Sequence, residues 1–246
     1  MTEVAPGREA PLPKWVPAAL SFVAGYVDSY TFLALFGLFV AQVTGSFVIG
    51  TAEVVAHDSG IVGKLIAILA FLFAAGLTAG LIGFARERRG ALPSMLAFET
   101  ALLALFSVTL LTSAPIDGAD DWHGILAGAF GAMAMGTQSV VVRLLMRGIP
   151  QTNVMTGNMT QLGIETTALL LAWRSRARHP GDRGHAEEFA AVRSRLSVVL
   201  AIALGFLIGA AAGAVVYARA GLPGAPVAVL IVAALTLWAG WRERRG

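Results

Sequence analysis

Two short polar segments interrupt the apolar sequence, and they carry residue types suited to binding a solute or shaping a break in a helix. "QVTGSFVIGTAEVV" and "NVMTGNMTQLGIETTALL" share a Thr-Gly-polar start and a glutamate nine positions after the threonine. The matched residues, at one constant offset, are Thr44 and Thr156, Gly45 and Gly157, Ser46 and Asn158, and Glu53 and Glu165. This duplication favours a buried element over a turn at the membrane surface.

We interpret each segment as the start of a re-entrant helix. Thr44 or Ser46 is expected to cap the first helix, and Thr156 or Asn158 the second, because these side chains accept hydrogen bonds from free backbone N–H groups. Glycine permits the backbone conformations that such a break requires. Irregular backbone at membrane depth is tolerated only where it is buried in protein or lines a wet cavity.

Asp28, in "GYVDSYTF", is a carboxylate inside an apolar stretch. Its insertion costs roughly 2.5–3.5 kcal/mol, so it should face the bundle or a cavity. We predict a ligand or proton relay, and the alternative is a structural hydrogen bond to a neighbouring helix. The corresponding stretch of the second half, "MGTQSVVVRL", offers Gln138 instead of an acid. Three further uncharged polar residues suit the lining of a path for a polar solute: Asn153, Asn158 and Gln161.

Charged residues near the two segments have two readings each. Glu53 and Glu165 would lie about 12 Å beyond the Thr-Gly starts at 1.5 Å per residue. They then lie at the two mouths of a central cavity, or they are ordinary solvated helix ends. Arg143 either pairs with a buried carboxylate or, as we expect, extends to the cytoplasm at a helix end.

The composition is that of a polytopic α-helical membrane protein. Of 246 residues, 57% are hydrophobic and 13% are charged, whereas a soluble domain has about 25% charged residues. A helix crosses the hydrocarbon core with roughly 20 apolar residues. Six stretches qualify: Trp15–Phe39, Lys64–Ala85, Leu92–Ser113, Trp122–Leu145, Leu196–Ala218 and Leu222–Trp241.

The distribution of Lys and Arg predicts the topology, because cytoplasmic loops carry their excess. Eight spans would place Arg86–Arg89 outside and the acidic "DGADD" loop inside, which reverses the rule. Six spans, with the two Thr-Gly segments re-entrant, place the basic runs and both termini in the cytoplasm. Only Lys64 and Arg219 then face outward. The expected division is a disordered tail (1–13), a first membrane repeat (14–113), an external acidic loop (114–121) and a second repeat (122–246) with a cytoplasmic basic loop (174–195).

The two halves share one order of elements: a span with a polar centre, a Thr-Gly segment and two more spans. Gly76-x-x-x-Gly80 in the first half matches Gly209-x-x-x-Gly213 in the second. Three crossings per half invert the second half relative to the first, an arrangement that recurs in transporters. The predicted fold is therefore an all-α membrane protein with six transmembrane helices and two re-entrant half-helices in an inverted three-plus-three repeat. Glycine ladders such as Gly124-Gly128 indicate close helix packing.

Enzymatic signatures are missing from the sequence. The four histidines fall in predicted loops without H-E-x-x-H spacing, and neither a G-x-S-x-G elbow nor a Walker loop is present. The chain has no cysteine, which excludes disulfides and thiolate metal sites. We expect no enzyme, no metal, no cofactor and no nucleic-acid partner, since the arginines cluster at helix ends.

At these residues the sequence resembles the YoaK-like family of bacterial integral membrane proteins, domain of unknown function 1275. The resemblance rests on "AGYVDSYTFL" and "VTGSFV" in the first half, and on "MAMGTQSVVVR" and "NVMTGNMTQLGIE" in the second. The first half reads Thr-Gly-Ser where the family pattern leads us to expect Thr-Gly-Asn, which weakens the carry-over to Ser46. The resemblance implies a bacterial cell (inner) membrane protein of about six spans, and it implies no activity.

The function we predict is transport or facilitated passage of a small polar solute, with Asp28 and the two Thr-Gly segments at its centre and proton or cation coupling through Asp28. Two helix N-termini aimed at one point favour an anionic group, which Asp28 opposes unless it is protonated or binds a cation. The alternatives are a passive channel and a non-transporting membrane scaffold. The lipid bilayer is the expected partner, and the sequence leaves the oligomeric state open, a homo-oligomer included.

Overall fold

The computed structural model describes residues 12–85 and 90–245, and within them the secondary structure is helical. Most of the predicted tail and the arginines of 86–89 lie outside the described residues. The described elements are α1 (Trp15–Ala34), α2 (Val43–Ala56), α3 (Ile61–Ala85), α4 (Ala91–Thr112), α5 (Trp122–Leu145), α6 (Met155–Arg178), α7 (Arg183–Ala220), the short 3-10 helix η1 (Leu222–Gly224) and α8 (Pro226–Arg245).

Five of the described helices, α3, α4, α5, α7 and α8, are long and apolar enough to cross a membrane. The all-helical, membrane-type class predicted from composition is therefore confirmed. The first predicted span, α1, has 20 residues but carries Asp28, Ser21 and Ser29 along its length. The segment that contains Thr44 forms a helix of 14 residues, which is too short to cross a hydrocarbon core of about 30 Å.

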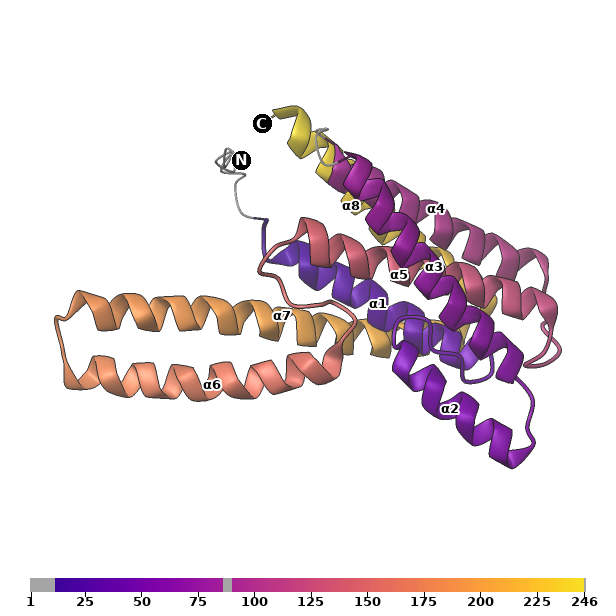
Figure 1. Cartoon of the computed structure of the whole chain (residues 1–246), viewed down its shortest axis with the longest axis horizontal. Helices are drawn as coiled ribbons and strands as arrows, with labels where there is room; N and C mark the ends of the chain where they lie inside the picture. The colour runs from indigo at the N-terminus through magenta and orange to yellow at the C-terminus, as the bar shows by residue number, and fades with distance from the viewer. Residues whose placement is uncertain (1–11, 86–89, 246) are drawn as a thin grey trace.

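The predicted basic loop 174–195 is wrong, because most of it is helical. α6 continues to Arg178 and α7 begins at Arg183, so only four residues separate the two helices. Arginine, alanine and glutamate all have high helix propensity, and such a segment extends a helix beyond the apolar core. Figure 1 shows α6 and α7 as an antiparallel hairpin that projects away from the remaining helices.

The helices pack in two matched pairs. α1 packs along α7, and α5 packs along α3 (Figure 1). Since α1 and α5 open the two halves of the chain, and α3 and α7 are the third helices of each, every pair joins one half to the other. α4 packs against α5 and against its counterpart α8.

Glycines let the backbones of α1 and α7 touch. A Cβ on Gly205 would lie 2.5 Å from the carbonyl oxygen of Ala18, and Cβ atoms on Gly209 and Gly213 would overlap the carbonyls of the next two turns of α1. In the other pair, a Cβ on Gly136 of α5 would lie 2.5 Å from the carbonyl oxygen of Phe71 in α3. Ladders of small residues permit this approach.

The glycine match between the halves does not extend to packing. Gly76 and Gly80 have open space around their Cβ positions, whereas their sequence counterparts on α7 meet the backbone of α1. In the α3–α5 pair the close contact is made from α5 instead. The partner helix therefore decides which face of a glycine ladder makes the close contact.

The chain reverses direction after α1 and again after α5. Phe36 and Gly37 have positive φ angles of 52° and 80°, and they turn the chain back along α1. Gly148, at the position that matches Phe36, has a φ of 77°. A non-glycine residue with a positive φ angle is uncommon, so contacts with neighbouring residues must stabilise this conformation of Phe36.

The loop before α5 ends in a capped helix start. Asp121 accepts hydrogen bonds from the backbone N–H groups of His123 (2.8 Å) and Gly124 (3.4 Å). The bond from His123, with that from Gly124, holds the pKa of this half-buried carboxyl below its usual range.

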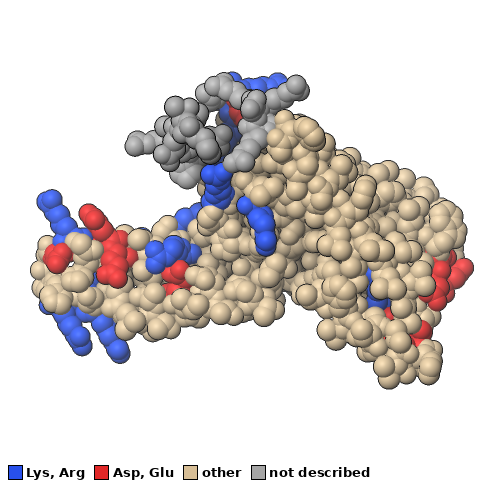
Figure 2. Space-filling view, in the orientation of Figure 1, with Lys and Arg blue, Asp and Glu red and all other residues tan. Residues whose placement is uncertain are grey.

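Charge is unevenly distributed over the visible face. Figure 2 shows Lys and Arg mainly over the α6–α7 hairpin and toward the chain ends, where some Asp and Glu accompany them. At the opposite end Asp and Glu predominate, with little Lys or Arg, and uncharged residues cover the surface between the two ends. An uncharged band between charged ends is typical of a membrane protein.

Candidate functional site

Asp28 holds the backbone that precedes α2. Its Oδ1 accepts hydrogen bonds from the N–H groups of Val40 (2.9 Å) and Ala41 (2.7 Å), and its Oδ2 accepts from that of Gln42 (3.1 Å). The residue is 2% exposed. After α1 the chain therefore turns back alongside that helix as far as Asp28, and only then does α2 begin. These bonds match the structural alternative for Asp28, and a role in coupling stays a prediction.

The polar residues after the Thr-Gly pairs make the same bond in both halves. Ser46 Oγ donates to the carbonyl of Phe39 at 2.7 Å, and Asn158 Nδ2 donates to the carbonyl of Gln151 at 2.7 Å. Each side chain bonds to a carbonyl seven residues earlier in the chain. The bond ties the irregular segment before the helix to the first turn of that helix. The duplicated sequence thus forms a duplicated local structure.

The predicted capping role is wrong for all four candidates. α2 begins at Val43 and α6 at Met155, and neither residue before them makes a side-chain cap. Thr44 and Thr156 lie inside the first turns and are exposed. A side chain in the first turn cannot occupy the N-cap position, and Asp28 binds the free N–H groups before α2 from another helix instead.

The break before α6 is fixed by α1, α5 and α7. Gln138 Nε2 donates to the carbonyl of Leu20 (3.0 Å) and to Thr152 Oγ1 (2.9 Å). Ser21 Oγ lies 2.8 Å from the carbonyls of both Thr152 and Ile202. The buried amide of Gln138 and the buried hydroxyl of Ser21 thus hold the segment before α6, as the carboxylate of Asp28 holds the segment before α2.

The two breaks meet in the middle of the molecule. Asn153 Nδ2 donates to the carbonyl of Ala41 at 3.4 Å, and both residues are buried. Asn153 and Ala41 occupy matched positions in the two segments. Contact between matched positions is what a twofold relation between the halves produces at its axis.

Each glutamate of the repeat pairs with a basic residue of the next helix. Glu53 Oε1 lies 2.7 Å from Lys64 Nζ, and Lys64 is 2% exposed. Glu165 accepts from Arg195 Nε at 3.1 Å and 3.2 Å, and from Gln161 Nε2 at 2.9 Å. Lys64, which the predicted topology left facing outward, is therefore neutralised within the protein. Neither glutamate is an ordinary solvated helix end.

The larger of two cavities lies beside the break before α6. Its volume is about 550 Å³, and its walls come from the loop after α5, the first turns of α6 and the middle of α7. The residues that line it are Arg143, Gly148, Ile149, Pro150, Gln151, Val154, Gly157, Asn158, Gln161, Glu165, Ser194, Arg195, Val198 and Val199. Because half of this lining is polar or charged, the cavity suits water and a polar solute rather than lipid.

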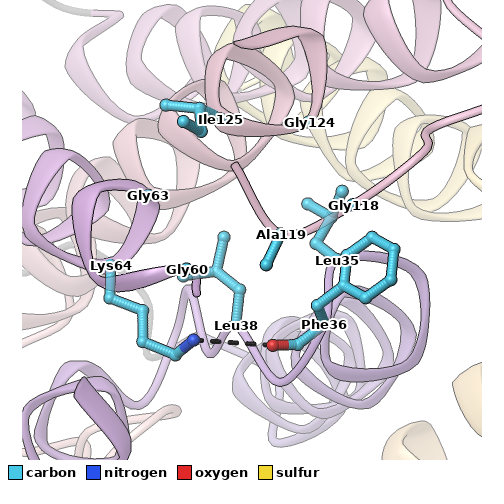
Figure 3. Close-up of a pocket in the computed structure, with 10 residues that line it drawn as sticks. All are labelled: Leu35, Phe36, Leu38, Gly60, Gly63, Lys64, Gly118, Ala119, Gly124 and Ile125. Atoms are coloured by element: carbon cyan, nitrogen blue, oxygen red, sulfur yellow. Dashed lines mark hydrogen bonds between the residues drawn. The ribbon is translucent and has the colours of Figure 1, made fainter. Parts of the chain in front are cut away.

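The smaller cavity lies beside the loop after α1, which matches the loop after α5, but no residue of α2 lines it, whereas α6 lines the larger cavity. Figure 3 shows it between the loop after α1, the start of α3 and the start of α5, with Lys64 pointing toward the carbonyl of Phe36 at 3.5 Å. Its volume is about 10 Å³, which is about enough for one water molecule. The two cavities therefore share the matched loop and the third helix of each half, and they differ in volume and in their other walls.

The predicted site residues divide into three groups. Gly157, Asn158, Gln161 and Glu165 line the larger cavity. Asp28, Ser46, Gln138 and Asn153 shape the two breaks and line neither cavity. Thr44 and Thr156 are exposed, and a Cβ on Gly45 would press on the Phe39 ring at 2.7 Å.

Two residues were missed by the sequence reasoning. Arg195 was assigned to a loop, although it pairs with Glu165 at the cavity wall. Glu99, in α4, is fully buried, and neither of its carboxylate oxygens has a hydrogen-bond partner among the described residues. Its signal was present, because a carboxylate inside an apolar span is a functional candidate by default. Arg143 lies on the cavity wall, exposed at the helix end as expected.

In residues 12–85 and 90–245, no three His, Asp or Glu side chains lie together as a group that could hold a metal ion.

The comparisons with known proteins agree with the resemblance found in the sequence. The model of the family described as a protein of unknown function (DUF1275) matches residues 16–239. No curated protein and no solved structure matches the chain. Since the match covers nearly the whole chain, from the first turn of α1 into α8, this protein belongs to the DUF1275 family.

Proposed function

We propose that this protein is an integral membrane transporter for a small polar solute, built from six spans and two re-entrant helices as an inverted repeat. The first support is the duplicated break, in which matched residues make the same 2.7 Å bond and meet at one point. The second is that helices pair between the halves, because α1 of the first half packs on α7 of the second, and α5 of the second packs on α3 of the first. Both are expected of two halves that surround a common axis.

The observation that carries transport is the difference between the two cavities, each of which lies beside the loop that follows the first helix of a half. One measures about 550 Å³ and the other about 10 Å³. In alternating access, the two halves exchange conformations so that a site opens to one side while the other side is closed. The structure then corresponds to a state open on the side of Arg143 and Arg147, which we assign to the cytoplasm.

The lining of the larger cavity favours a solute with an anionic group. Arg143 and Arg195 contribute two positive charges against one negative charge from Glu165. The N-terminus of α6, which begins at Met155, adds the positive end of a helix dipole. From the sequence, the negative charge of Asp28 argued against an anionic solute. In the structure Asp28 lines neither cavity, and its carboxylate accepts hydrogen bonds from backbone N–H groups.

The proposed location is the bacterial cell (inner) membrane, with both termini in the cytoplasm. This activity requires neither enzymatic chemistry nor a cofactor or nucleic-acid partner.

The topology predicts where reporters will be found. A reporter fused after Gly90 should read cytoplasmic, and one inserted between Ile116 and Asp121 should read external. Alkaline phosphatase and a fluorescent protein, active on opposite sides, provide the paired measurement. The reverse pair of results would support eight spans and remove the inverted repeat.

Two single cysteines test which side each cavity faces, in a chain that has no native cysteine. Val154→Cys lies at the larger cavity and Ala119→Cys at the smaller one. An impermeant maleimide should label Val154→Cys in inside-out vesicles and not in right-side-out vesicles. Labelling of Val154→Cys from both sides at once would indicate a channel instead.

Flux completes the test of the function. Proteoliposomes should take up at least one member of a panel of labelled amino acids, carboxylic acids and sugars, and empty liposomes should not. A chain that is folded and correctly inserted, but moves none of them, would favour the scaffold alternative.

Filling the larger cavity should stop uptake without unfolding the protein. Gly157 lines the cavity, and a Cβ there meets only Val154 Cγ1, at an ordinary 3.7 Å. Gly157→Leu should therefore reduce uptake at least about tenfold and leave the melting temperature nearly unchanged, apart from the helix propensity gained. Gly163→Leu is the matched control, because Gly163 lies on α6, outside the cavity, with open space around it. Equal uptake by the two variants would exclude this cavity from the path.

A further inference from the structure

Glu99 is a buried carboxyl group that does not line the cavity of the proposed solute path. It lies in the first half of α4 and is 0% exposed. Neither Oε1 nor Oε2 has a hydrogen-bond partner among the described residues. An unpartnered ionised carboxylate in such a place is strongly disfavoured, and a neutral carboxylic acid is much less so.

The register of α4 and α5 brings Glu99 level with another unpartnered polar atom. A Cβ on Gly131 of α5 would lie 3.5 Å from the ring of Phe106 in α4. Consecutive helices that pack together run antiparallel, and seven residues are close to two turns. Moving two turns toward the same end of both helices leads from Phe106 to Glu99 and from Gly131 to Gln138. The Oε1 of Gln138 is buried and, within the described residues, has no partner.

Other charges are distant from this level. α5 carries His123 at its first turn and Arg143, exposed, at its last. α8 carries its charged residues in its last turns, from Arg242 to Arg245. α3 carries Lys64, which is paired with Glu53, and α4 has Glu99 as its own acidic residue. No charged side chain of the described helices α3, α5 and α8 is therefore at the level of Glu99, and α1 reaches α4 through Tyr30, whose ring packs on Phe106 two turns from Glu99.

Gln138 connects this place to the break before α6. Its Nε2 already holds Thr152 and the carbonyl of Leu20, while its Oε1 is free to accept a proton donor. We propose that Glu99 takes up and releases one proton inside the membrane, and that Gln138 transmits its protonation state to the Gln151–Val154 segment at the larger cavity. This proposal rests on the transport function above and names its coupling ion.

The step involves only a proton. The carboxylate of Glu99 takes a proton from water on one side of the membrane and becomes a neutral acid, whose O–H can donate to Gln138 Oε1 when the two side chains move into contact. Release to water on the other side restores the carboxylate. A metal cation fits less well, because hard cations take about six oxygen ligands and this place offers three.

Infrared difference spectroscopy of the purified protein in lipid tests the proton site directly. The difference spectrum of the parent should contain one carbonyl-stretch band that appears at acidic pH, vanishes at alkaline pH and is absent from Glu99→Gln, whereas the bands of the other carboxyl groups remain. The Glu99 band should persist, shifted in frequency, in Glu99→Asp. Glu165→Gln is the matched control, since Glu165 is ion-paired with Arg195, and that variant should retain the band.

Three results would overturn the proposal. The first is that every carboxyl band of the parent survives in Glu99→Gln, and the second is that the Glu99 band stays unchanged from acidic to alkaline pH. The third is a band removed at constant pH by sodium or potassium chloride, which would identify a cation site. No transported solute is needed, so the result is independent of flux. Flux without a titrating band would refute the proton site alone, and a titrating band without flux would refute transport.

The link to the cavity has its own measurement. In purified protein in detergent, where a maleimide reaches both sides, the labelling rate of Val154→Cys, relative to that of Val55→Cys on the exposed end of α2, should change about tenfold between the protonated and deprotonated states. The same ratio should be constant with pH in Glu99→Gln and in Gln138→Leu. A ratio that still varies with pH in Glu99→Gln would refute the coupling.

Discussion

Asp28→Leu will yield little or no folded protein. Leucine removes the acceptor for the N–H groups of Val40 and Ala41, which are buried, and of Gln42, which is half-buried. Each unpaired buried N–H costs about 1–3 kcal/mol, so the two buried groups alone cost about 2–6 kcal/mol, a large part of the stability of many domains. Size-exclusion chromatography and thermal unfolding in detergent measure the loss.

Two further variants make the Asp28 result specific. Asp28→Asn keeps one acceptor oxygen and should fall between the parent and the leucine variant. Ser29→Ala is the matched control, because Ser29 is next in the chain, half-buried, and makes no side-chain hydrogen bond within the described residues. If Asp28→Leu melted like Ser29→Ala, the carboxylate would not hold the break. If Asp28→Asn folded normally yet lost gradient-driven flux, Asp28 would be the coupling group predicted from the sequence.

Gly209→Leu will separate α7 from α1. A Cβ on Gly209 would overlap the backbone carbonyl of Phe22, and a backbone cannot move aside as the tip of a side chain can. Overpacking typically costs about 1–3 kcal/mol, and this site should lie at or above the upper limit. The expected observation is a lower melting temperature and loss of uptake together, because the α1–α7 pair joins the two halves.

Gly76→Leu is the control that the repeat itself provides. Gly76 matches Gly209 in sequence, but its Cβ position is open. This variant should therefore fold like the parent. Equal damage by the two substitutions would mean that the motif matters for helix formation and not for the contact with α1.

The sequence by itself determined the class and the repeat. Hydropathy is a local property, so a run of about 20 apolar residues identifies a membrane helix wherever it packs. Thr-Gly-polar at one constant offset was visible in the same way, and the matched bonds of Ser46 and Asn158 confirm that the duplication has a structure. The break at each segment could be predicted, because glycine and a short polar side chain act on their own neighbourhood.

Only the tertiary structure decided what those residues contact. The capping expectation failed because the acceptor for the N–H groups before α2 comes from Asp28, on another helix, and residue type does not reveal such a partner. The pairing of Glu165 with Arg195 likewise depends on α7 returning alongside α6. The glycine ladders were visible, but which of them meets a backbone was not.

The same limit applies to the site. Both halves carry a Thr-Gly segment, yet the cavities beside their matched loops measure about 550 Å³ and 10 Å³, and this difference depends on how far helices from distant parts of the chain lie apart. Glu99 was recognisable as a carboxylate in a span, but its lack of a partner is a property of everything packed around α4. Local sequence fixes what each segment can become, whereas burial and pairing are sums over many helices, which only their packing in space determines.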